Sequence, residues 1–135
     1  MDTVILPRVI YEQMLAESRQ VLPNECCGLL GGKGGVVKEI FPSSNSLVSP
    51  SAYEIPPEEL FAHFRAMREQ KLSLVAIYHS HPQGENAPSR RDRERAYYPD
   101  AAYIIVSPEK GNPAPVRAFH LDGEGWKELA LSVKD

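Results

Sequence analysis

The sequence is poor in cysteine and has no long apolar run. Only two cysteines, the adjacent Cys26 and Cys27, occur among its 135 residues. Neighbouring side chains of a strand point to opposite faces, which does not favour a disulfide between them, and no C-x-x-C spacing indicates a cysteine zinc site. We therefore expect reduced, buried thiols in the cytoplasm. No apolar run approaches the roughly 18 residues of a membrane span, and the first residues lack the pattern of a signal peptide.

The chain also lacks a strong excess of charge of either sign. Its formal net charge is −3, with 15 basic and 18 acidic residues, so the overall charge gives no reason to expect nucleic-acid binding. One basic cluster, Arg90 to Arg95, is interrupted by Asp92 and Glu94, and we interpret it as a solvated helix face. A hydrophobic share of 42% over this length predicts one globular domain, residues 1–135, with one core. The sequence leaves the oligomeric state open.

Hydrophobic periodicity predicts helices interleaved with strands. Apolar residues recur at helical spacing after Pro7 and again after Pro56-Pro57, and a short third helix is predicted from Ser89 to Tyr98. The continuous apolar run from Leu72 to Tyr78 is typical of a central strand that is buried on both faces. The other predicted strands are 3–6, 26–30, 36–41, 52–55, 102–106, 116–121 and 126–133. This order predicts an α/β or α+β fold with one mixed β-sheet flanked by helices.

Two histidines with a spacing suited to metal binding follow the predicted central strand. His79 and His81 are two residues apart, and side chains at that spacing on a strand point to the same face. Their imidazoles can converge on a zinc ion, which takes about four ligands and keeps one position for water at a catalytic site. Asp92 follows a polar loop that can fold back over the strand end. We therefore predict His79, His81 and Asp92 as the metal ligands.

The same segment allows an interpretation without metal. Ser89-x-x-Asp92 is a capping box, in which Ser89 caps the start of a helix and Asp92 reaches back to the backbone of Ser89. The two interpretations differ on Asp92, because a carboxylate committed to zinc is poorly placed to cap a helix. They agree that a helix starts at Ser89.

A catalytic metal site also benefits from a carboxylate that moves a proton. Glu25 lies between the predicted helix end at Pro23 and the strand that starts at Cys26, where partial burial would raise the pKa of its carboxyl. The alternative for this residue is an exposed loop acid. His63 and His120 have no partners in the sequence, and we expect packing or surface roles for them.

Together these residues resemble the motif of the JAMM (MPN-plus) metalloprotease family. That motif has an early glutamate, then H-[ST]-H-P, an interval of seven residues, and S-x-x-D. Here it reads Glu25, then His79-Ser80-His81, seven residues from Pro82 to Pro88, and then Ser89 and Asp92. The segment that starts at Pro23 also resembles the family's P-x-E-x-C-G-x-L-x-G stretch. The resemblance covers nearly the whole chain.

The resemblance implies the MPN fold, which is similar in layout to cytidine deaminases, although the deaminase signature P-C-x-x-C is absent here. It implies that His79, His81 and Asp92 hold one zinc ion per chain and that Glu25 is the general acid and base. Ser89 would help to stabilise the oxyanion that forms at the attacked carbonyl. The implied activity is hydrolysis of an amide bond by a zinc metalloprotease.

The resemblance also indicates a class of partner. Family members cleave after the C-terminal Gly-Gly tail of ubiquitin or ubiquitin-like proteins, and this short chain resembles the compact bacterial members. We expect a peptidase that releases cysteine or another C-terminal extension from a ubiquitin-like sulfur carrier protein. The alternatives are a general isopeptidase acting on lysine-linked conjugates and a non-catalytic MPN scaffold. Scaffold members usually lack the metal ligands, which this chain has. We expect neither a nucleic acid nor a membrane as a partner.

Overall fold

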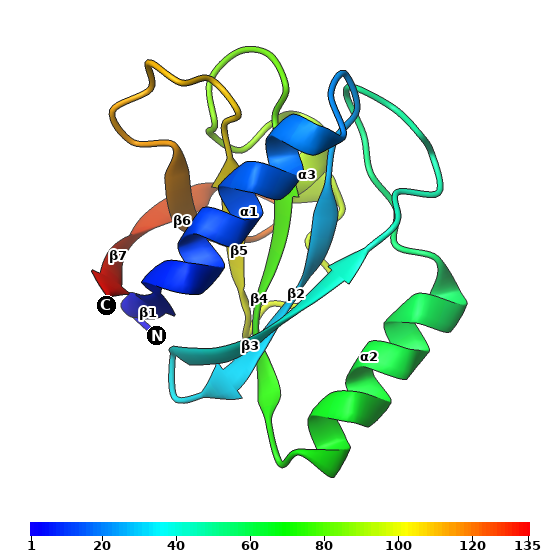
Figure 1. The fold of residues 1–135 in the computed structure, drawn as a ribbon, viewed down its shortest axis with the longest axis vertical. Coiled ribbons are helices and arrows are strands. Elements are labelled where there is room, and N and C mark those ends of the chain that lie inside the picture. Colours follow the sequence, from blue (N-terminus) through cyan, green and yellow to red (C-terminus); the bar gives the residue numbers. More distant parts are fainter.

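A mixed β-sheet that closes on itself forms the centre of the molecule (Figure 1). The computed structural model describes residues 1–135. Its strands are β1 (Thr3–Pro7), β2 (Cys27–Lys33), β3 (Val36–Ser43), β4 (Ser73–Ser80), β5 (Ala102–Val106), β6 (Val116–Leu121) and β7 (Trp126–Lys134). They follow one another in the order β1-β3-β2-β4-β5-β6-β7, and β7 pairs with β1. The predicted mixed sheet is confirmed, because β4 and β5 pair in parallel while β2 and β4 pair antiparallel.

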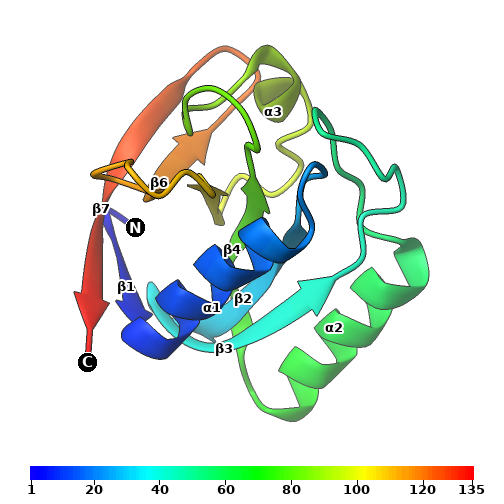
Figure 2. The same cartoon turned by 45° about the horizontal axis from the view of Figure 1, so that its top comes forward.

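Two long helices cover opposite faces of this sheet. Helix α1 (Arg8–Gln20) contributes Ile10 and Met14 to one apolar cluster, and α2 (Pro57–Glu69) contributes Met67 to the other. Figure 2 shows α1 lying across the sheet and α2 standing beside β3. A third helix, α3 (Arg90–Glu94), lies beyond the end of β4. None of the three has the length and apolar character that a membrane crossing requires.

Strand β4 runs through the core and ends at His79 and Ser80, next to the site. Ala76 and Tyr78 pack in the cluster under α1, whereas Ile77 packs in the cluster under α2. Because both faces are covered, the strand is apolar along its length, as the sequence predicts. The strand then continues to His79, which pairs with Cys27 of β2 on one side and with β5 on the other. The functional residues therefore begin at the buried end of a rigid central strand.

Two predicted elements differ from the structure. Residues 52–55 form no strand, because the side chain of Asn45 holds them as a loop, donating to Ala52 O and accepting from the N–H of Glu54. Helix α3 ends at Glu94 and does not reach Tyr98. Beyond it the chain turns inward, and Tyr98 packs against the cluster under α2. Tertiary packing thus outweighs the helical pattern there.

Candidate metal centre

Three side chains meet just beyond the end of β4. The Nε2 atoms of His79 and His81 are 3.2 Å apart. The carboxylate of Asp92, on α3, faces both: Oδ1 lies 3.1 Å from Nε2 of His79, and Oδ2 lies 3.1 Å from Nε2 of His81. The structure therefore brings together the three residues that the sequence indicates as ligands. The other two histidines lie apart from them, with His63 bonded to Ser43 and His120 exposed on β6.

The spacing of these atoms fits a zinc ion. Ligands bound at about 2.0–2.1 Å in a tetrahedron lie roughly 3.3–3.4 Å from one another. The two Nε2 atoms are 3.2 Å apart, and each lies 3.1 Å from one of the two carboxylate oxygens of Asp92, close to the edges of such a tetrahedron. Two imidazoles and one carboxylate are also a donor set that zinc accepts at catalytic sites, with the fourth position left open.

Contacts behind the two imidazoles hold them in place. Nδ1 of His81 lies 2.8 Å from the carbonyl oxygen of Glu85, and donation to that oxygen leaves the Nε2 lone pair directed at the centre. The ring of His79 is buried and stacks on Tyr53, with centroids 4.5 Å apart and planes inclined by 20°. Its Nδ1 has no hydrogen-bond partner within the protein. Tyr53 was not among the residues that the sequence singled out, since no motif marks it.

Asp92 both caps its helix and faces the histidines. The N–H of Ser89 donates to Oδ2 of Asp92 at 2.9 Å, and the N–H of Asp92 donates to Oγ of Ser89 at 3.1 Å. The capping box is therefore complete. Capping does not turn Asp92 away from the histidines, because a carboxylate has enough lone pairs to accept from a backbone N–H and still face both imidazoles.

The electrostatics of the centre favour an ionised aspartate. Burial alone would raise the pKa of Asp92, but hydrogen bonds with His79 and His81 outweigh burial and hold that pKa well below its usual range. For His81, burial lowers the pKa, while the hydrogen bonds to Asp92 and to the Glu85 carbonyl raise it to a net higher value. An ionised carboxylate beside two imidazoles suits a divalent cation.

Glu25 is a buried acid at the edge of this centre. It lies between α1 and β2 with 5% of its surface exposed, and its Oε1 has no hydrogen-bond partner within the protein. Burial raises the pKa of its carboxyl to about 8, and the charges of His81, Asp92 and Arg91 also act on it. The alternative of an exposed loop acid is therefore wrong. A carboxyl in these surroundings can hold a proton near neutral pH.

Two serines of the motif have different surroundings. Ser80 is buried, and its Oγ accepts a hydrogen bond of 2.8 Å from the N–H of Cys26, which ties the start of β2 to the end of β4. Ser89 is exposed, and its Oγ accepts only from the N–H of Asp92. Its hydroxyl proton has no acceptor within the protein, so it is available to a bound molecule. Cys26 packs in the core under α1, and Cys27 lies beside His79.

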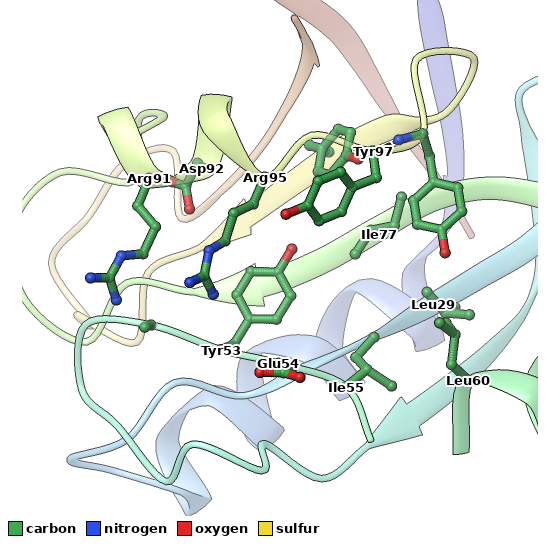
Figure 3. Close-up of a pocket in the computed structure, with 13 residues that line it drawn as sticks. Leu29, Tyr53, Glu54, Ile55, Leu60, Ile77, Arg91, Asp92, Arg95 and Tyr97 are labelled. Atoms are coloured by element: carbon green, nitrogen blue, oxygen red, sulfur yellow. Dashed lines mark hydrogen bonds between the residues drawn. The ribbon is translucent and has the colours of Figure 1, made fainter. Parts of the chain in front are cut away.

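An apolar pocket adjoins the centre (Figure 3). Its volume is about 370 Å³, and most of its wall is aromatic or aliphatic. The pocket shares Asp92 and Tyr53 with the metal centre, and Arg91 and Arg95 also line it. The remaining wall includes Ile55, Leu60, Tyr97, Tyr98 and Tyr103. No motif in the sequence marks this pocket, because its residues come from five separate stretches of the chain and share no periodic pattern.

Comparison with known proteins identifies a family and its members. Residues 7–122 match the model of Prok-JAB, described as prokaryotic homologs of the JAB domain. The chain is 36% identical to a desampylase of Haloferax volcanii over 83% of the chain and 80% of that protein. It is 34% identical to the CysO-cysteine peptidase of Mycobacterium tuberculosis over 88% of the chain and 84% of the relative. A probable TtuB-protein conjugate cleaving protease of Thermus thermophilus is 37% identical over 95% of the chain and 81% of its own length.

Solved structures agree on the fold. The solution structure of a Desulfitobacterium hafniense protein has a TM-score of 0.84 and 32% identity, over 98% of this chain and 93% of the other. A structure described as JAMM, a metalloprotease-like zinc site in the proteasome and signalosome, has a TM-score of 0.64 and covers both chains completely. Its identity is 18%, so this second likeness concerns the fold alone.

Proposed function

The chain belongs to the Prok-JAB family, the prokaryotic homologues of the JAB domain within the JAMM class, and on this basis we propose that residues 1–135 form a single zinc-dependent peptidase domain. The bond that it hydrolyses is the amide after the C-terminal Gly-Gly tail of a ubiquitin-like sulfur carrier protein. The observation that carries this proposal is the meeting of His79, His81 and Asp92 within 3.1–3.2 Å of one another.

The side chains around the centre have separate roles in this proposal. His79, His81 and Asp92 hold zinc, which when bound supplies a Lewis acid and lowers the pKa of a water. Glu25, a buried carboxyl with a raised pKa, takes up a proton and delivers it to the departing amine. Ser89 donates its free hydroxyl proton to the oxygen of the attacked carbonyl, where negative charge develops.

The names of the relatives support the substrate class. One is a CysO-cysteine peptidase and another is a probable protease of TtuB-protein conjugates. We propose that this chain, too, acts on a glycine-tailed carrier and releases cysteine or another C-terminal extension. The two free cysteines, both buried, suit a reducing compartment, and we propose the cytoplasm as the place of the reaction.

Cleavage of lysine-linked conjugates is the second candidate function. The observation that favours it is the 37% identity to the relative named for cleaving protein conjugates. A non-catalytic scaffold is disfavoured, because a protein that only binds partners has no need for three converging ligands and a buried, unpaired glutamate.

The proposal is tested by metal analysis and hydrolysis together. We expect about one zinc per purified chain and much less than one in His81→Ala. His63→Ala, on α2 and apart from the centre, is the matched control and should keep zinc. The zinc-loaded protein should cleave a carrier ending in Gly-Gly-Cys faster than the same carrier joined to a lysine ε-amino group, and chelation should abolish both reactions. A metal-free wild-type protein that cleaves neither substrate after zinc addition would overturn the proposal.

A further inference from the structure

The exposed arginines of α3 and its C-terminal cap differ in their surroundings. Arg90 pairs with Glu94 at the surface, Nε to Oε1 at 2.8 Å, as the sequence interpretation expects. Arg91 and Arg95 instead line the apolar pocket beside Asp92, and neither takes part in an ion pair. Figure 3 shows the two side chains extending in the same direction from α3 and its cap, with Arg95 directed toward Tyr53.

This arrangement is complementary to an anion. Like charges four residues apart on a helix repel each other, and an anion placed between them would relieve that repulsion. Besides Asp92, the only acidic residue in the pocket wall is Glu54, which forms no ion pair with either arginine. A planar guanidinium beside apolar walls pairs well with a carboxylate, since it can donate two parallel hydrogen bonds.

Of the two arginines, Arg91 is the one adjacent in the chain to the proposed ligand Asp92. It precedes the ligand Asp92 in the sequence, and its charge acts on the carboxyl of Glu25. In the proposed reaction Glu25 protonates the departing amine. When that amine belongs to a single amino acid, its α-carboxylate carbon lies only about 2.5 Å from the nitrogen, across one Cα. Arg91, which lines the same pocket wall as Asp92, is therefore a suitable partner for this α-carboxylate.

We propose that Arg91 binds the α-carboxylate of the leaving amino acid, which makes the chain a carboxypeptidase for carriers extended by one residue. This inference rests on the proposed function. In the reaction a water oxygen bonds to the glycine carbonyl carbon and the C–N bond breaks. The nitrogen receives a proton, and the products are the Gly-Gly-ended carrier and a free amino acid held by Arg91. Arg91 is thus a binding residue that selects the leaving group, and a lysine-linked conjugate offers it no carboxylate at this position.

The experiment varies the substrate carboxylate and the arginine together. The source organism's own Gly-Gly-ended sulfur carrier, prepared as a thioester, is ligated either to cysteine or to cysteinamide. The two substrates differ only in one carboxylate. The kcat and KM of the zinc-loaded wild type, Arg91→Ala, Arg91→Lys and Arg90→Ala are measured on both. Arg90→Ala removes the same charge from the same helix at a position paired with Glu94.

We expect the wild type to prefer the cysteine adduct by about 10- to 100-fold, the usual range for a hydrogen-bonded charge pair. Arg91→Ala should lose that factor on the cysteine adduct, mainly through KM, and should change by less than about threefold on the cysteinamide. Arg91→Lys should recover part of the preference, and Arg90→Ala should keep all of it. The ratio of the two substrates cancels any effect of Arg91 on Glu25, because both substrates use the same proton donor.

Equal losses of activity on both substrates in Arg91→Ala would overturn the inference. They would show that Arg91 acts on an acidic side chain of the carrier or on Glu25 and not on the α-carboxylate. A wild type that cleaves both substrates equally well would also overturn it, while leaving the proposed function intact. A wild type that holds zinc and cleaves neither substrate would instead contradict the proposed function itself.

Discussion

At the scale of single residues, Glu25 combines burial with an unsatisfied carboxyl oxygen. A buried polar atom without a partner costs about 1–3 kcal/mol, so a residue with only a structural role would be expected to find one. Its raised pKa of about 8, caused by burial, lets the carboxyl exist in both protonation states near neutral pH. These properties destabilise the fold and suit proton transfer.

Replacing Glu25 by Gln should therefore separate metal binding from hydrolysis. The amide has nearly the shape of the carboxyl but can neither take up nor deliver a proton, so we expect zinc content near that of wild type and a loss of at least about 100-fold in kcat. Metal analysis and turnover on the cysteine-extended carrier measure the two properties. Near-normal turnover in Glu25→Gln would show that another group moves the proton.

The three residues that converge could be predicted from the sequence, but their surroundings could not. The fixed interval between His81 and Asp92 is a property of the chain itself, so it could be recognised without coordinates. Tyr53, which stacks on His79, and Arg91, which acts on Glu25, depend on how distant segments pack. Neither contact leaves a local pattern. The burial of Glu25 was suggested only by its place between a helix end and a strand.

At the scale of elements, α3 shows how a five-residue helix can hold Asp92, the proposed ligand, in place. Isolated helices of this length are unstable, so the capping box and the packing of the following segment must fix it. The cap orients Asp92, and Asp92 in turn faces His79 and His81. In the sequence the cap and the metal ligand look like alternatives, but one carboxylate can accept from the backbone and still face both histidines.

Two variants of Ser89 should separate its role as a helix cap from its role as a hydroxyl donor. Alanine cannot cap and should cost about 1 kcal/mol of stability, whereas glycine costs only a few tenths. Neither supplies a hydroxyl, so both should lower kcat, by about 100-fold or more if Ser89 stabilises the oxyanion as proposed. Thermal denaturation and kinetics measure the two effects. Recovery of wild-type turnover in Ser89→Gly would limit Ser89 to its role as a cap.

Helix α1 is joined to β4 by a hydrogen bond that depends on pH. The hydroxyl of Tyr78 donates to the carboxylate of Glu17, at 2.9 and 3.0 Å. Burial raises the pKa of Glu17 to about 7, although the hydrogen bond from Tyr78 lowers it. The folded protein thus binds more protons here than the unfolded chain does. The stability that the folded protein gains from holding this carboxyl protonated is full below about pH 4.5 and is lost as the pH rises to about 7.

Replacing Glu17 by Gln should remove this loss of stability with rising pH, because the amide does not ionise. We expect the difference in Tm between Glu17→Gln and wild type to grow by roughly 3–8 °C between pH 5 and pH 8, corresponding to about 1–2 kcal/mol for a partly exposed carboxyl. Glu12→Gln, an exposed position on the same helix, is the control and should show no such trend. A difference that stays constant with pH would contradict the raised pKa.

At the scale of the whole molecule, the sequence pattern left the pairing of the strands open, and the structure shows that the sheet closes on itself. The periodicity of single segments predicts strands and their burial, and it identified most of them here. The pairing of β1 with β7 joins the two ends of the chain, and no local pattern records a contact of such separation. Figure 1 shows β1 and β7 side by side as a result. The closed sheet fixes the end of β4, which carries His79 and Ser80.

Zinc should stabilise the entire domain, because its proposed ligands come from different elements. His79 belongs to the sheet, His81 begins the following loop, and Asp92 belongs to α3, so an ion bound by all three links the loop and helix to the core. At a zinc concentration of about 100 times the dissociation constant, linkage predicts about 2.7 kcal/mol of stabilisation, or roughly 6–12 °C in Tm. Differential scanning fluorimetry of chelated and zinc-loaded protein measures this shift.

His63→Ala should retain the shift and His81→Ala should lose it, because only His81 contributes a donor atom to the centre. An unchanged Tm on zinc addition to the chelated wild type would mean that the three side chains converge without binding the ion.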